Sequence, residues 1–148
     1  MDAEAQLSGF IDRYTPQVAA DARRSLAFLS RRLPTATRLV YDNYNALVVG
    51  FGTSDKVGDI ILSLALYPRW VTLFFLRGTV LPDPYGLLEG SGSTVRGVRL
   101  QPISRLETAE VGALIDAAVA NAVPLPASGE GQLIIKSISA KQRPRRPA

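Results

Sequence analysis

Two neighbouring apolar runs constrain the fold more than any other feature of this sequence. Residues 60–67 (IILSLALY) and 70–77 (WVTLFFLR) are rich in β-branched, leucine and aromatic residues, and only the tight Pro68-Arg69 turn separates them. Runs joined by so short a connection predict two antiparallel strands. Both runs are apolar at successive positions, whereas a sheet with one wet face alternates apolar and polar residues. Both faces of these strands therefore need cover, from the chain's own helices and loops or from a second copy in a homodimer.

Two amphipathic helices precede these strands. Apolar residues between Leu7 and Tyr14 follow the i, i+3, i+4, i+7 spacing of one helical face. Thr15-Pro16 is typical of an N-cap followed by proline at the first helical position. Helical spacing then continues until Pro34, which ends the second helix. Each helix has an apolar face that the sheet can cover.

Further runs complete the predicted order of elements. The sequence predicts strands at 38–41, 46–51, 95–100 and 132–138 and a helix at 111–122. Two helices followed by strands with short connections predict an α+β fold. We expect an antiparallel sheet of about five to six strands, two N-terminal helices and one C-terminal helix.

Length and charge indicate one domain followed by a basic tail. The chain has 148 residues, with 17 Lys and Arg against 13 Asp and Glu, which is the size of a single domain. The surplus cations all lie in the last eight residues, at Lys141, Arg143, Arg145 and Arg146. We therefore assign 1–140 to one neutral domain and predict that 141–148 is disordered. Such a tail would attract nucleic acid only weakly and without sequence preference.

Composition excludes several classes of chemistry. The chain has no Cys and no His, so disulfides, thiol chemistry and ordinary zinc or copper sites are ruled out. A catalytic base would have to be a carboxylate, Lys or Tyr with a shifted pKa, and no nucleophile motif is present. We assign no catalytic or metal-ligating residue and no cofactor. The N-terminus lacks the features of a signal peptide and no apolar run approaches the about 18 residues of a membrane helix, which predicts a cytoplasmic protein with no membrane partner.

The densest run of hydrogen-bonding side chains is Tyr41, Asp42, Asn43, Tyr44 and Asn45. Two phenols and three amide or carboxylate groups could surround a small polar ligand. The alternative is a plain hairpin turn, because Asn and Asp tolerate left-handed backbone and cap themselves. We expect Asn43→Ala and Asn45→Ala to lower stability by about 1 kcal/mol if these residues only form the turn.

A second candidate ligand contact is the glycine-rich loop that contains Ser91. Its free amides, with Arg96 and Arg99 nearby, could hold an anion, and Glu89 at the start of the loop is a further candidate ligand contact. Neither of the usual phosphate-loop motifs is present, and glycine is also the default residue wherever the backbone needs φ > 0. Loop geometry is therefore the competing explanation.

Three blocks of the sequence together resemble a known family. They are LYPRWVTLFFLRG (66–78), LPDPYGLLEGSGSTVRGVRL (81–100) and LETAEVGALIDAAVANA (106–122), and the LLEGSG step with Arg96 is the most specific part. The chain resembles the YdhG-like family of bacterial domains of unknown function (family 1801). The resemblance implies helices packed on an antiparallel sheet, similar to the frataxin architecture.

Some relatives of that family are described as frataxin-like iron chaperones, so the resemblance implies iron as an alternative cargo. An iron role requires a clustered acidic surface. The N-terminal acids Asp2, Glu4, Asp12 and Asp21 are spread along the chain. The sequence favours a non-enzymatic accessory domain that binds a small polar ligand, with iron handling and weak binding of nucleic acid as alternatives.

Overall fold

The helices begin where the sequence places their caps. In the computed structural model, which describes Met1–Ala148, the α-helices are α1 (Ala3–Asp12), α2 (Pro16–Arg32) and α3 (Ala109–Ala120). Asp2, Thr15 and Thr108 each accept a hydrogen bond from a backbone N–H of the first turn. These bonds satisfy amides that have no partner within the helix. None of the three helices combines the length and the apolar composition that a bilayer span needs.

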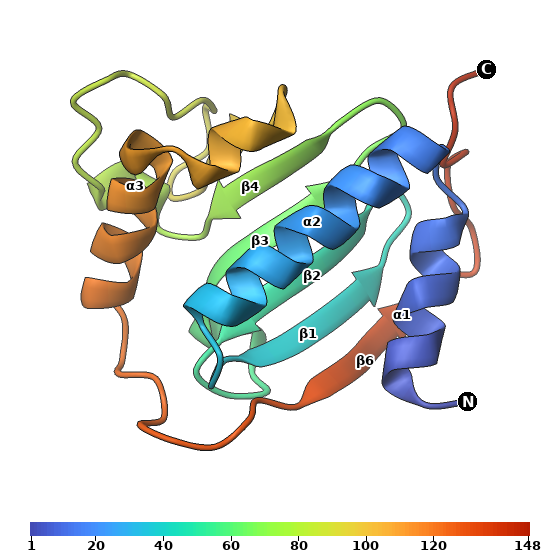
Figure 1. Cartoon of the computed structure of the whole chain (residues 1–148), viewed down its shortest axis with the longest axis horizontal. Coiled ribbons are helices and arrows are strands. Elements are labelled where there is room, and N and C mark those ends of the chain that lie inside the picture. Colours follow the sequence, from blue (N-terminus) through green and yellow to red (C-terminus); the bar gives the residue numbers. More distant parts are fainter.

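Six strands form one sheet in the order β5-β4-β3-β2-β1-β6. They are β1 (Thr37–Asp42), β2 (Leu47–Gly52), β3 (Ile60–Leu66), β4 (Val71–Phe75), β5 (Arg96–Arg99) and β6 (Leu133–Ile138), with short 3-10 turns η1 (Val57–Asp59), η2 (Gly78–Val80) and η3 (Ile103–Glu107). The predicted α+β class, with two N-terminal helices and one C-terminal helix, is confirmed (Figure 1).

The sheet is mixed rather than wholly antiparallel. Strands β1 to β5 pair antiparallel, but β6 runs parallel to β1. After α3, residues 121–132 carry the chain to the β1 edge, so β6 enters the sheet in the same direction as β1 (Figure 1). A connection of this kind permits parallel pairing, whereas a tight hairpin would not.

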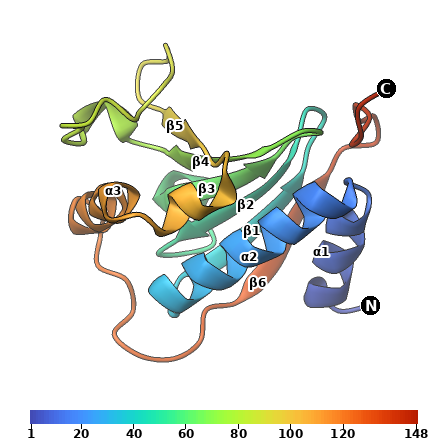
Figure 2. The same cartoon turned by 45° about the horizontal axis from the view of Figure 1, so that its top comes forward.

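All three helices lie on one side of the sheet (Figure 2). On this side, Val40, Val49, Leu64, Leu73 and Val98 are register neighbours across five strands, and all belong to the buried core with residues of α1, α2 and α3. This one-sided cover explains half of the apolar pattern in the two central strands.

The other face of the sheet has no helix over it. Its centre is built from small residues that large neighbours overlie: Ile60 lies against Gly50, and Phe74 lies against Gly97. A Cβ at either glycine would come within 2.8 Å of the neighbouring side chain, so glycine permits this close packing. A homodimer through this face stays a prediction.

The C-terminal residues differ from the predicted disordered tail. Residues 142–146 fold back onto the end of β1, and Arg145 is only 5% exposed. Four cations between prolines cannot fold alone, but here the segment folds against another part of the chain. The partner is a buried carboxylate, described next.

Candidate functional site

Strand β1 places two opposite charges on the face that the helices cover. Side chains alternate along a strand, so Arg38 and Asp42 point to the same side as buried Val40. Asp42 is 1% exposed, and an isolated buried carboxylate would be strongly unfavourable. The groups around Asp42 and Arg38 therefore determine whether each charged side chain is paired within the protein or open to a ligand.

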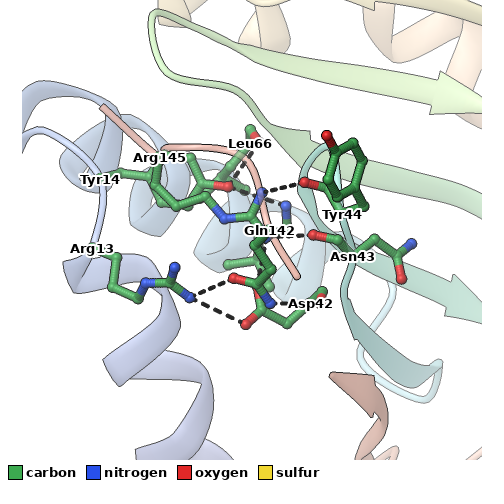
Figure 3. Close-up of polar contacts among 9 residues, drawn as sticks. Arg13, Tyr14, Asp42, Asn43, Tyr44, Leu66, Gln142 and Arg145 are labelled. Atoms are coloured by element: carbon green, nitrogen blue, oxygen red, sulfur yellow. Dashed lines mark hydrogen bonds and ion pairs between the residues drawn. The ribbon is translucent and has the colours of Figure 1, made fainter. Parts of the chain in front are cut away.

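Arg145 supplies the main counter-charge to Asp42 (Figure 3). Its Nη2 donates to Oδ1 of Asp42 at 2.9 Å and to the carbonyl of Asn43 at 2.6 Å. Its guanidinium carbon lies 5.8 Å from the centre of the Tyr14 ring. Charge-assisted hydrogen bonds in a dry environment are among the stronger polar interactions of a protein. The pair holds the C-terminal segment on the β1–β2 turn.

Arg13 and Gln142 complete the enclosure of Asp42 (Figure 3). Nη1 of Arg13 lies 3.4 Å from Oδ2 of Asp42 and donates to Oε1 of Gln142 at 2.7 Å. The side-chain amide of Gln142 donates to the Asp42 carbonyl at 2.9 Å. We name Arg13, Tyr14, Asp42, Gln142 and Arg145 the Asp42 cluster. Its groups pair with one another, apart from the buried Nε of Arg145, which has no hydrogen-bond partner, and such mutual pairing is typical of a structural network.

Tyr14 joins the Asp42 cluster to the sheet. Its hydroxyl donates to the carbonyl of Leu66 at 3.0 Å and accepts a hydrogen bond from the N–H of Leu47 at 3.1 Å. Burial raises the pKa of the Tyr14 phenol, and the hydrogen bond from Leu47 opposes that rise. The phenol is therefore held in its neutral, donating form.

The five predicted turn residues do not together surround a cavity, although Asp42 lines an open hollow of about 570 Å³ with Arg13 and Gln142. The turn itself is present, closed by the Asn43 N–H on the Ala46 carbonyl at 3.0 Å. The side chains of Asn43 and Asn45 are exposed, and Tyr44 is 44% exposed. Tyr41 points to the opposite face of the sheet from Asp42, and its buried hydroxyl has no hydrogen-bond partner. The chain's own C-terminal segment occupies the position at Asp42 that a polar ligand would take.

The second predicted region lies far from the first. The loop with Glu89 and Ser91 projects at the β5 edge, whereas Asp42 is near the other edge (Figure 2). Glu89 pairs with Gly97 through backbone hydrogen bonds, and Ser91 is exposed. The guanidinium of Arg96 donates to the carbonyls of Gly92 and Val95. These bonds brace the loop, and the structure does not bring the two predicted regions together.

At its other end, β1 opens into a cleft between α1 and α2. The cleft has a volume of about 330 Å³, within the range typical of small-ligand sites. The residues that line it are Glu4, Leu7, Ser8, Ile11, Arg23, Leu26, Ala27, Ser30, Arg38 and Val49. We name this site the Arg38 cleft. The two helices meet at the turn between them and diverge over the β1–β6 edge (Figure 1).

Arg38 has fewer side-chain partners than Arg23, the other cation in this cleft. Its side chain is 21% exposed, and its ion pair is with Glu4, at 3.3 Å, whose own side chain is 67% exposed. Arg23, the other cation on the wall, is tied to Asp12 at 2.7 Å and to Ser8 at 3.2 Å. An ion pair with an exposed partner, such as Arg38–Glu4, contributes little to the stability of the protein. The Arg38 guanidinium is therefore available to an incoming anion.

The sequence reasoning did not select Arg38. The signal was present, since Arg38 and Asp42 stand at alternate positions around apolar Val40 in a strand that needed helical cover. Charged residues on a covered face require a partner or a solvent opening. The sequence pattern does not show which of the two charges has a partner and which faces an opening. Only the fold shows that Asp42 is enclosed by partners and that Arg38 faces a cleft.

Two other hollows differ from the Arg38 cleft in lining or in size. One adjoins the Arg38 cleft, shares Glu4, Ser30 and Arg38 with it, and continues to Gly131 with a volume of about 360 Å³. The other lies beneath the end of α3 next to Arg77, is largely apolar, and measures about 50 Å³. That volume holds only a few water molecules.

No three acidic side chains gather at a point where they could share a metal ion. Glu107 pairs with Arg24 at 2.7 Å, and the hydrogen bond from Arg24 lowers the pKa of Glu107. Asp59 accepts a hydrogen bond from Ser54 at 2.6 Å. The structure therefore contributes no observation in favour of iron handling.

Comparison of the chain with protein-family models, with characterised proteins and with solved structures gives no match.

Proposed function

We propose that this protein is a cytoplasmic, non-enzymatic binding protein whose ligand is a small anion with a short apolar part, held in the Arg38 cleft. The observation that carries the proposal is the partly buried Arg38 guanidinium, which has one exposed ion-pair partner and faces a cleft of about 330 Å³. Small-ligand sites typically combine an apolar lining with a few placed polar groups.

The lining determines the ligand chemistry. Arg38 offers planar, paired donors that suit a carboxylate or a phosphate. The hydroxyls of Ser8 and Ser30 lie on the same walls, and apolar contact comes from residues such as Leu7 and Val49. An anionic head near Arg38 would displace Glu4, an exposed pair whose loss has a small effect on stability. The apolar part of the ligand would then lie between the two helices.

A titration followed by amide chemical shifts tests this proposal. The probes are butyrate, hexanoate, inorganic phosphate and the neutral analogue hexanol. We expect hexanoate to give saturable shifts at Leu7, Ser30 and Val49, and hexanol to give much smaller shifts. Arg38→Gln should abolish the hexanoate response.

Arg31→Gln is the matched control, because Arg31 is exposed on α2 outside the lining of the cleft. This variant loses the same formal charge and should bind hexanoate as the wild type does. Equal hexanoate binding by wild type and Arg38→Gln would reject the site, as would shifts confined to the C-terminal arginines.

A further inference from the structure

The folded C-terminal segment gathers most of the net charge of the protein on one surface. Lys141, Arg143 and Arg146 are exposed, and Arg13 beside them has 48% of its side chain exposed. We name these four residues the basic surface. Of the carboxylates beside it, Asp42 is buried and already paired with Arg145, and Asp12, which lines a hollow together with Arg146, is paired with Arg23. The basic surface therefore keeps an excess of positive charge.

Specific contacts hold this surface in place. The N–H of Arg143 donates to the Tyr44 carbonyl at 2.8 Å, and Nε of Arg146 donates to the Arg13 carbonyl at 3.2 Å. Between them, Arg145 is anchored on Asp42 at 2.9 Å. Cations fixed to a folded surface lose less conformational entropy on binding than cations of a mobile chain. The charge is therefore pre-organised.

An exposed aromatic ring lies within the basic surface. Tyr44 is 44% exposed, and the guanidinium carbon of Arg143 lies 5.9 Å from the centre of its ring. Proteins that bind single-stranded nucleic acid combine cations along the backbone with aromatic rings on which bases stack. A membrane-binding surface would instead present several large apolar side chains around its cations. Here the sequence neighbours are Asn43, Asn45 and two prolines, and Ile138, which lines a hollow with Arg13, is a large apolar side chain exposed nearby.

We propose that the basic surface, with Tyr44, binds single-stranded nucleic acid through its phosphate backbone. Arg13, Lys141, Arg143 and Arg146 would each contact a phosphate, and one base would stack on Tyr44. This differs from weak attraction to a disordered tail, because the contacts need the segment to be docked on Asp42. The proposal is independent of the Arg38 cleft.

The main test is fluorescence anisotropy of a labelled oligo-dT with the full-length protein between 50 and 200 mM salt. Four phosphate contacts on a single strand give a log–log salt slope of about −2.8. The double variant Arg143→Ala/Arg146→Ala should reduce the slope to about −1.4 and weaken binding about 25-fold at about 0.1 M salt. Both side chains are exposed, so the variant should fold normally.

The matched control is Arg31→Ala/Arg77→Ala, which removes the same charge at the other end of the sheet, where β1 begins and β4 ends. It should bind oligo-dT almost as tightly as the wild type. An equal loss in both double variants would show that only net charge matters and would overturn the proposal. Tighter binding to phosphatidylserine vesicles than to oligo-dT would overturn it in favour of a membrane.

Two further variants test docking and stacking. Asp42→Asn adds one positive charge but removes the anchor of Arg145, so a docked surface predicts weaker binding and a mobile polycation predicts equal or tighter binding. Oligo-dT binding by Asp42→Asn and by the wild type is compared under conditions in which far-UV circular dichroism shows that the variant is folded. If Asp42→Asn does not fold, the two arginine double variants test the proposal. Tyr44→Ala should weaken oligo-dT binding severalfold and leave duplex binding unchanged, and an equal effect on both would contradict the stacking role.

Discussion

The two ends of β1 carry opposite charges on the same covered face, but the two side chains differ in burial and in the number of their partners. Asp42 has 2% of its side chain exposed and is contacted by Arg145, Arg13 and the C-terminal segment. Arg38 has 21% of its side chain exposed and one ion-pair partner, the exposed Glu4. A buried charge with a complete set of partners is part of the architecture. A half-buried charge that faces a cleft is free to bind a ligand.

Removal of the Asp42 carboxylate should have the largest effect on stability. Asp42→Ala leaves the buried guanidinium of Arg145 without its counter-charge. Loss of one partner of a buried ion pair lowers the free energy of unfolding by about 3–5 kcal/mol. Urea unfolding measures this change.

The control for Asp42 is Glu4→Ala, which removes an exposed carboxylate from the pair at the other end of β1. Glu4→Ala should lower the free energy of unfolding by less than about 1 kcal/mol. If the two alanine variants were equally stable, the contrast between an enclosed and an open end of β1 would be wrong.

Tyr14→Phe should have the second largest effect. The substitution keeps the ring but leaves the buried N–H of Leu47 without its acceptor and the Leu66 carbonyl without its donor. Orphaned buried polar groups lower stability by about 1–3 kcal/mol. Tyr85→Phe serves as the control, because Tyr85 is 67% exposed. A result within error of that control would show that the Asp42 cluster is not coupled to the sheet through Tyr14.

The same phenol predicts a pH dependence. Because burial raises the pKa of Tyr14 in the folded protein, the unfolded chain loses this proton first, near pH 10. The stabilising contribution of Tyr14 is fully present below about pH 10 and declines as the pH rises through the folded pKa. The stability difference between wild type and Tyr14→Phe should therefore shrink above pH 10. A difference that stays constant from pH 8 to 11 would contradict the raised pKa.

Local features of the fold could be predicted from the sequence. The caps at Thr15 and before Pro34, the apolar runs and the Asp42–Asn45 turn depend on residues within a few positions of one another, where sequence patterns are informative. The parallel pairing of β6 with β1 was not predictable in this way, because a strand's own sequence does not specify the direction of its partner.

The candidate sites depend on contacts that are distant in sequence. Arg145 and Asp42 are separated by 103 positions, so a proline-interrupted basic segment gave no indication of its buried acceptor. Arg38 was overlooked for a related reason, since a strand with one charge at each end does not reveal which end another segment encloses. Charge counting located the surplus cations correctly, but only the fold shows that they are held on a surface.

The smallest effect should come from Glu4→Gln in the Arg38 cleft. The carboxylate of Glu4 competes with a ligand anion for the Arg38 guanidinium at 3.3 Å. Since an exposed pair contributes about 0.2–1 kcal/mol, its removal should strengthen hexanoate binding about one-and-a-half- to fivefold and change stability by less than about 1 kcal/mol. Glu110→Gln is the control, because Glu110 is exposed on α3 and lies outside the lining of the cleft. Weaker binding of hexanoate by Glu4→Gln, with the control unchanged, would mean that Glu4 holds the Arg38 guanidinium in place and does not compete with the anion, which would contradict this prediction.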